Sequence, residues 1–210
     1  MSGLLSLIQW LSPAFPTGGY AYSHGLEQAV VDGTLSDAPS LQRWLTDIIT
    51  HGTGCQDAIL LACALREGAD YDALADLAMA LASGAERAEE TLAQGTALAQ
   101  TVSALTGRRL KPCALPVALG QAAAPLNLPA PQVIALYLHA FTSNLVQTMV
   151  RFVPLGQTEG QTALAALHPL IERLAQTLST ATTDDLATAT FGAEMAAMRH
   201  QTLQPRIFKT

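Results

Sequence analysis

The side chains that could bind a metal ion or catalyse a reaction are few in this sequence, and they lie far apart. No HExxH or CxxC motif occurs among the five histidines and three cysteines. No GxxxxGK[ST] phosphate-binding loop is present, and the adjacent Glu89 and Glu90 would point to different faces of a helix instead of forming an acid–base pair. We therefore predict no catalytic residue, no metal site and no cofactor. Each histidine taken alone is better interpreted as a hydrogen-bonded structural residue; they are His24, His51, His139, His168 and His200.

Composition restricts the class of protein further. The formal net charge of −6 argues against a nucleic-acid partner, because such partners require a basic face. Charged residues make up 13% of the chain, against about 25% in ordinary soluble proteins, so we expect other subunits to cover part of the surface. Half of the residues are hydrophobic but only 5% are aromatic, which predicts a core of alanine and leucine in closely packed helices.

Apolar residues recur at helical spacing along most of the chain, and alternation with a period of two is absent. We predict an all-α fold, a single-domain bundle of roughly eight to ten helices over residues 1–210. Pro39 is typical of a helix start and precedes a clear amphipathic face. Asp184 and Asp185 favour the start of a last helix, whose buried side would carry Phe191, Met195 and Met198.

The first charged side chain is Glu27, so the apolar start of the chain must be tested as a targeting segment. It has no basic region, and it runs into Pro13 and Pro16 where a small-residue cleavage site would be needed. No apolar run approaches the roughly 20 residues that span a bilayer. We expect a cytoplasmic protein without a membrane partner.

The N-terminal segment, residues 1–24, ends in a loop of unusual composition. Two prolines fix φ and two glycines permit positive φ ahead of a helix expected to begin near Tyr22. Tyr20 and Tyr22 flank this turn, and His24 follows it. The loop is interpreted equally well as a helix entry with aromatic packing or as a binding loop presented to a partner.

The C-terminal tail, residues 200–210, combines apolar and basic residues. Pro205 ends any helix, and Ile207 and Phe208 then stand between Arg206 and Lys209. We expect this apolar pair to lie outside the core. The tail is interpreted either as a frayed terminus or as a segment that orders when it docks on a partner.

The centre of the chain predicts two helices joined by a rigid corner. The first helix should stop at Pro154 and Gly156, and Thr158 with Gln161 has the spacing of a capping box for the second. Polar groups occur where a purely structural hairpin needs none. The candidate corner residues are Asn144, Arg151, Pro154, Gly156 and Gln157.

These three segments together resemble UreF-type urease accessory proteins. The family typically carries a SPALPxGxxxYSxGLE-like start, a YLHxWxxNxVxAxVRLVPLGQTxGQ-like centre and a HETQYxRLFRS-like end. Here the corresponding segments are SPAFPTGGYAYSHGLE, YLHAFTSNLVQTMVRFVPLGQTEGQ and HQTLQPRIFKT, so the resemblance covers nearly the whole chain. The tail departs from the pattern at Gln201, where the family usually has Glu, and at Gln204, where it usually has Tyr.

The resemblance implies a non-enzymatic assembly role. UreF-like proteins are all-helical homodimers that bind a UreD/UreH-type accessory protein and recruit the UreG-type GTPase. Through that complex they support nickel insertion into apo-urease. On this basis the tail from Arg206 to Lys209 would dock on the UreD/UreH-type partner, and Tyr20, Tyr22 and His24 would face the GTPase or the second copy. Asn144 and Arg151 would be buried polar groups that fix the corner.

Three other functions are weighed against this one. An independent nickel chaperone would bind the ion through histidine and cysteine, and the wide spacing of these residues speaks against it. A GTPase-activating or regulatory protein would supply an arginine to the GTPase, but Arg43, Arg66 and Arg87 lie in no distinctive finger loop. A helical enzyme comes third, since no motif favours it.

Overall fold

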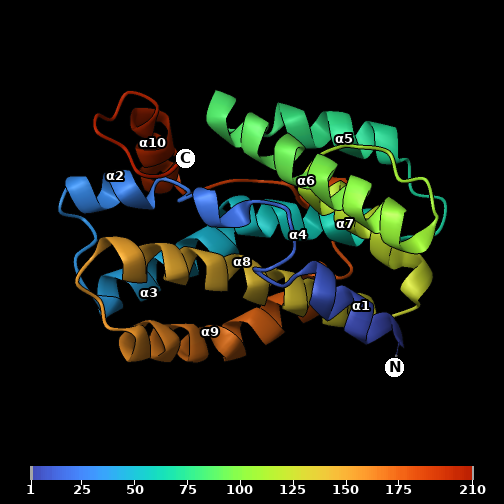
Figure 1. Cartoon of the computed structure of the whole chain (residues 1–210), viewed down its shortest axis with the longest axis horizontal. Helices are drawn as coiled ribbons and strands as arrows, with labels where there is room; N and C mark the ends of the chain where they lie inside the picture. The colour runs from blue at the N-terminus through green and yellow to red at the C-terminus, as the bar shows by residue number, and fades with distance from the viewer. Residues whose placement is uncertain (1, 210) are drawn as a thin grey trace.

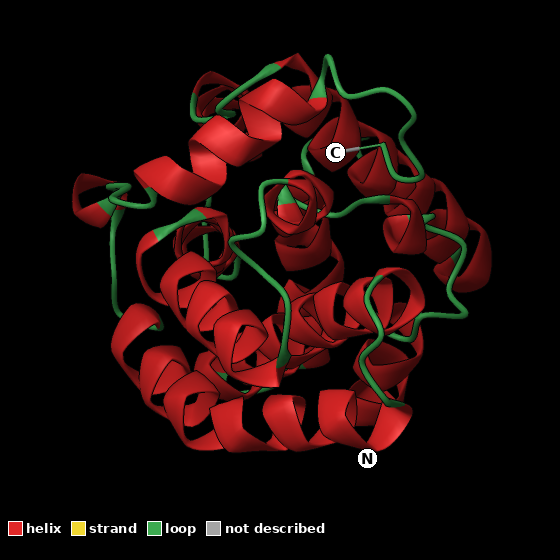
Figure 2. Ribbon diagram, turned by 90° about the vertical axis from the view of Figure 1, so that its left-hand side faces the viewer, coloured by secondary structure: helices red, strands yellow, loops and turns green. Residues whose placement is uncertain are grey.

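The computed structural model describes residues 2–209, and this part of the chain forms α-helices and short 3-10 turns without a β-strand (Figures 1 and 2). The all-α prediction is confirmed; Met1 and Thr210, the first and last residues of the predicted terminal segments, lie outside the described residues. The elements are α1 (Ser2–Trp10), η1 (Gly19–Ala21), α2 (Leu26–Val31), α3 (Ala38–His51), α4 (Thr53–Ala64), α5 (Tyr71–Ala80), α6 (Ala85–Thr106), α7 (Leu115–Ala123), η2 (Ala124–Leu126), α8 (Ala130–Phe152), α9 (Gln157–Leu178), η3 (Thr183–Asp185) and α10 (Phe191–His200).

The pair α8 and α9 forms one side of the core, and α3 and α4 pack against it (Figure 1). The two helices turn back on each other through a short corner, in which Val153 and Leu155 are buried. The corner falls where the sequence predicts it, but its cap differs: the Gly156 amide donates to Oε2 of Glu159 at 2.8 Å. The capping contact is therefore made by Gly156 and Glu159, and not by Thr158 and Gln161, which the sequence predicted.

Helix α8 is long and apolar enough to cross a membrane by length and composition alone. The expectation that no apolar segment approaches that length therefore needs correction. Half of its most apolar stretch is buried inside the bundle, where Leu138, Leu145 and Met149 are almost fully covered. The apolarity of α8 is thus accounted for by its place in the core.

Small residues set the spacing between several helices, as the alanine-rich composition predicts. A Cβ atom added to Gly120 of α7 would lie 2.4 Å from the Cβ of Ala64 in α4. A Cβ added to Gly95 of α6 would lie 1.9 Å from the carbonyl oxygen of Cys113, just ahead of α7. These contacts leave no room for a larger side chain.

The predicted orientation of the last helix is wrong. Asp184 and Asp185 lie in η3, and α10 begins later, at Phe191. The predicted buried residues of α10 are exposed by 48% to 71% of their surface; they are Phe191, Met195 and Met198. Small residues face the protein instead, because a Cβ on Gly25 would lie 2.8 Å from the Ala197 amide nitrogen. That close approach requires alanine on the inner side of α10 and leaves the large residues outside.

Two glycine-to-alanine changes in helices test this packing. We expect Gly120→Ala to destabilise the protein by about 1–3 kcal/mol, because the new methyl group overpacks the contact with Ala64. Gly192→Ala has nothing within 4 Å of its new methyl group and should be neutral or stabilising by about 0.5 kcal/mol. Urea unfolding of both variants measures the difference. Equal stability of the two proteins would contradict the close approach of α4 and α7.

Candidate functional site: a surface where the chain ends meet

The three segments that carry the sequence resemblance meet at one place in the structure. The C-terminal tail runs beside the N-terminal loop, where the Lys209 amide donates to the Ala21 carbonyl at 2.8 Å (Figure 1). At the end of α8, the Arg151 guanidinium donates to the Tyr20 carbonyl at 3.0 Å. The loop, the end of α8 and the tail therefore form one continuous surface. We call the exposed part of it the terminal surface, defined by Tyr20, Arg151, Arg206, Ile207 and Lys209.

A buried carboxylate holds the tail in place. Glu27, at the start of α2, is 2% exposed, and its two oxygens accept hydrogen bonds from the Ile207 amide at 2.8 Å and the Phe208 amide at 3.0 Å. Its Oε2 atom also contacts Nε2 of His200 at 2.9 Å. One side chain thus links α2, the end of α10 and the tail.

His200 extends this link to α6. Its ring is fully buried, and Nδ1 lies 3.3 Å from Oε2 of Glu86 while Nε2 contacts Glu27. Each ring nitrogen therefore faces one carboxylate, Nδ1 that of Glu86 and Nε2 that of Glu27. Glu86 also pairs with Arg206 of the tail.

The tail is therefore part of the folded body, and the expectation that its apolar pair lies outside the core is half wrong. Phe208 is 7% exposed and packs edge-on against Phe152, with 6.0 Å between ring centroids. The Arg151 guanidinium carbon lies 5.6 Å from the centre of the same ring. Ile207 is 71% exposed, so only one residue of the apolar pair lies in the core.

The N-terminal loop also divides into an exposed and a buried part. Tyr20 is 62% exposed, whereas Tyr22 and His24 are 6% and 9% exposed. The Lys209 ammonium lies 5.8 Å from the centre of the Tyr22 ring. Burial, and then the charge of Glu90, raise the pKa of Tyr22. Of the three residues predicted to contact a partner here, only Tyr20 is available on the surface.

The helix after this loop begins at Leu26, several residues beyond the predicted start. His24 and Gly25 both have positive φ, 52° and 76°, which reverses the chain before the helix can begin. This turn directs the His24 ring inward. There Nε2 lies 2.8 Å from Oε1 of Glu90, and the ring meets Phe141 edge-on at 4.9 Å between centroids.

The contact of His24 belongs to a buried ionic cluster that joins α4, α6 and α8. The Arg87 guanidinium lies 2.6 Å from Oδ2 of Asp57 and 3.4 Å from Oε2 of Glu90. The Tyr137 hydroxyl donates to the same Asp57 oxygen at 2.7 Å. All these side chains are at most 11% exposed or lie in the core.

Electrostatics within the cluster favour the charged forms of Arg87 and Glu90 and the neutral form of Tyr137. Burial lowers the pKa of Arg87, but the negative charges of Asp57 and Glu90 outweigh it, so the pKa is raised overall. Burial raises the pKa of Glu90, but His24 and Arg87 lower it more, so Glu90 is ionised at neutral pH. Burial, followed by the charge of Asp57, raises the pKa of Tyr137 and keeps its hydroxyl protonated.

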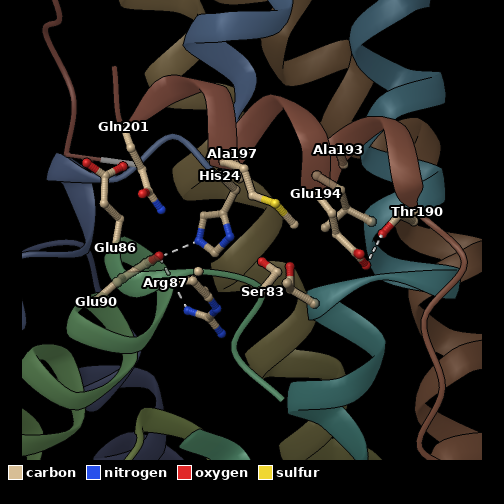
Figure 3. Close-up of a pocket in the computed structure, with 14 residues that line it drawn as sticks. His24, Ser83, Glu86, Arg87, Glu90, Thr190, Ala193, Glu194, Ala197 and Gln201 are labelled. Carbon is tan, nitrogen blue, oxygen red and sulfur yellow. Dashed lines mark hydrogen bonds and ion pairs between the residues drawn. The ribbon is translucent and has the colours of Figure 1, made fainter. Parts of the chain in front are cut away.

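A pocket between α6 and α10 lies over this cluster (Figure 3). His24 and Arg87 both point toward Glu90 in its wall, and their polar atoms are turned toward one another. The opposite wall comes from the small residues of α10, with Ala193 and Ala197 among them. Because His24, Arg87 and Glu90 bind each other, this wall of the pocket holds the N-terminal loop against α6.

The remaining corner residues have separate positions. Arg151 is exposed, contrary to the prediction that it is buried. Asn144 is half-buried and lies further back along α8, where its Nδ2 atom is 3.3 Å from the position of a Cβ added to Gly19. The turn itself exposes its remaining candidate residues, Pro154, Gly156 and Gln157.

Sequence reasoning missed the two buried ionic groups. The available signal was the presence of Glu27 and Asp57 in otherwise apolar helical stretches, where a charge requires a buried partner. Which residue supplies that partner depends on helices far apart in the chain. Residues 2–209 contain no group of three or more histidine, cysteine or acidic side chains placed to hold a metal ion.

Replacing adjacent tail residues tests whether the tail is part of the folded body. Phe208→Ala should lower the free energy of unfolding by about 3 kcal/mol, because it removes a buried ring that packs on Phe152. Ile207→Ala should change it by less than about 0.5 kcal/mol, since the side chain is exposed. Urea unfolding followed by circular dichroism measures both. A frayed tail would make the two variants equally stable.

The ionic cluster gives a second prediction. Arg87→Met should cost about 3–5 kcal/mol, because Asp57 and Glu90 would remain buried without their shared cation. The matched control, Arg109→Met, changes an exposed arginine and should alter stability by less than about 0.5 kcal/mol. Thermal and urea unfolding compare the two. An Arg87 variant as stable as the control would show that the cluster does not support the fold.

Comparison with known proteins agrees with the resemblance seen in the three segments. The sequence model of the UreF family matches residues 35–168 of this chain. A protein of Cereibacter sphaeroides named urease accessory protein UreF is 62% identical over 209 residues, which cover all of this chain and 99% of that protein. Proteins of the same name from Paracoccus denitrificans and Jannaschia sp. are 52% identical over 206 residues and 49% over 208 residues. The alignments cover 98% and 99% of this chain, and 95% and 94% of those relatives.

The family match covers well over half of the chain, and the relatives align along almost its whole length. The fold, the meeting of the three segments and these matches lead to one conclusion. The chain belongs to the UreF family of urease accessory proteins.

Proposed function

We propose that this protein is a non-enzymatic assembly factor for nickel insertion into urease. It captures a UreD/UreH-type accessory protein at the terminal surface and, with it, recruits the UreG-type GTPase to apo-urease. It acts in the cytoplasm as a single-domain subunit of a homodimer. Membership of the family supports a role in urease maturation, and the remainder of this proposal depends on the surfaces of the chain.

The observation that carries the proposal is the composition and rigidity of the terminal surface. Tyr20 and Ile207 expose 62% and 71% of their area, and three cations surround them. Exposed aromatic, aliphatic and arginine side chains are typical of the centre of protein interfaces. Glu27 fixes the tail before any partner arrives, so binding would incur little of the entropy loss that ordering a free tail requires.

A second exposed apolar face supports more than one protein contact. The outer side of α10 presents Phe191, Met195 and Met198. Large apolar side chains gathered on one exposed helix face are typical of interaction sites. We assign this face to a second protein contact, with either the other copy of the homodimer or the GTPase.

The alternative functions receive less support. Arg87, a candidate arginine finger, is buried between Asp57 and Glu90. Arg66 donates to the carbonyl oxygens of Thr180 and Ala181 and so is engaged within the fold. An independent chaperone with a closed nickel site would need more ligands than any group within residues 2–209 provides.

Binding of the partner tests the role of the terminal surface. Ile207→Asp should weaken capture of the purified UreD/UreH-type protein by at least about tenfold, because it places a charge at the apolar centre of the contact. The control Leu105→Asp alters another exposed apolar residue, on α6, and should bind like the wild type. Biolayer interferometry gives the affinities, and thermal unfolding verifies that both variants are folded. If the Ile207 variant binds with wild-type affinity, the partner does not bind at the terminal surface.

A further inference from the structure

Two histidines outside the terminal surface face each other across the α8–α9 pair. The ring centroids of His139 in α8 and His168 in α9 are 5.3 Å apart, and the ring planes are inclined by 49°. The corner between the helices brings these rings together although they are distant in the sequence. Of the other histidines, His24 and His200 contact carboxylates and His51 lies exposed at the end of α3.

The separation of the two rings suits a shared metal ion. An imidazole nitrogen binds Zn²⁺ at about 2.0–2.1 Å, which puts the ring centroid roughly 3.2 Å from the ion. Two such centroids lie roughly 5.2 Å apart at a tetrahedral angle and about 4.5 Å apart at a right angle. The observed 5.3 Å matches the tetrahedral arrangement.

We propose that His139 and His168 together bind one divalent transition-metal ion, of the kind that imidazole ligands prefer, such as Ni²⁺. The proposal goes beyond the proposed function and does not depend on it, since that function concerns the terminal surface. It also revises the expectation from the sequence that each histidine is structural and that no metal site is present.

The chemistry of the pair favours metal binding over ion pairing. Among residues 2–209 no carboxylate forms an ion pair with either ring, so the ring nitrogens of His139 and His168 are not engaged in salt bridges. Neutral imidazole is the form that donates an electron pair to a metal ion.

The site has the properties of a temporary binding place. Structural metal sites are closed by four protein ligands, whereas this one offers two, and no third candidate ligand joins them among residues 2–209. His168 is exposed and His139 is half-buried, so the ion could enter from solvent and keep water on its open positions. Such an ion binds weakly and exchanges readily, as a transported ion must.

Calorimetric titration of the tag-free, full-length protein with NiCl₂ tests the site. We expect one Ni²⁺ per chain, with affinity weakened at least about tenfold by His139→Asn or by His168→Asn. The double variant should be no weaker than either single variant, because loss of one ligand already removes chelation. The control His51→Asn, at an exposed histidine far from the pair in sequence, should bind like the wild type.

Nuclear magnetic resonance of the histidine side chains gives a second test. If the two histidines were only structural, their signals would not respond selectively to the ion. Substoichiometric paramagnetic Ni²⁺ should broaden the ring signals of His139 and His168 first and leave those of the buried His24 and His200 sharp. Should His139→Asn prove unstable, His168→Asn alone decides, because its side chain is exposed. Absence of nickel binding, or binding that survives His168→Asn unchanged, overturns the proposal. Capture of the UreD/UreH-type partner by His168→Asn should be unaffected, which separates this test from that of the proposed function.

Discussion

The Glu27 carboxylate is the point on which the arrangement of the chain ends depends. It is buried, and it accepts hydrogen bonds from two successive tail amides while it contacts the His200 ring. Burying a carboxylate away from water is costly unless its oxygens accept hydrogen bonds. Glu27 therefore needs the tail and α10 as partners, and its contacts in turn hold both of them in place. This mutual requirement converts a terminal segment of mixed composition into an ordered part of the surface.

The second buried group, around Arg87, shows the same logic inside the body of the protein. Asp57 and Glu90 contact the Arg87 guanidinium, and the Tyr137 hydroxyl donates to Asp57. Asp57, Glu90 and Tyr137 come from three different helices. Buried ion pairs often contribute little net stability, since desolvation offsets their attraction, but they penalise any packing that separates them. Here they fix α4, α6 and α8 in a single relative arrangement and, through His24, fix the N-terminal loop as well.

Small residues and these ionic groups have complementary effects on the surface. Alanine and glycine let α10 approach Gly25 so closely that its large side chains must face outward. Some charged residues, which a typical protein would expose, are buried here. The result is a surface poor in charge with two exposed apolar faces, one at the tail and one on α10, and such faces are typical of protein-interaction sites.

The sequence by itself determined the helical class, most helix positions and the corner at Pro154 and Gly156, because these depend on local periodicity and on backbone restrictions. It also determined the family, through three ordered segments. It could not determine that these segments touch, since the contacts of Glu27 with the tail join opposite ends of the chain. Periodicity likewise assigned the wrong face of α10 to the core, because the inner face was decided by how closely two backbones approach. The pairing of His139 with His168 arose in the same way: a property of two packed helices, decided only by tertiary structure.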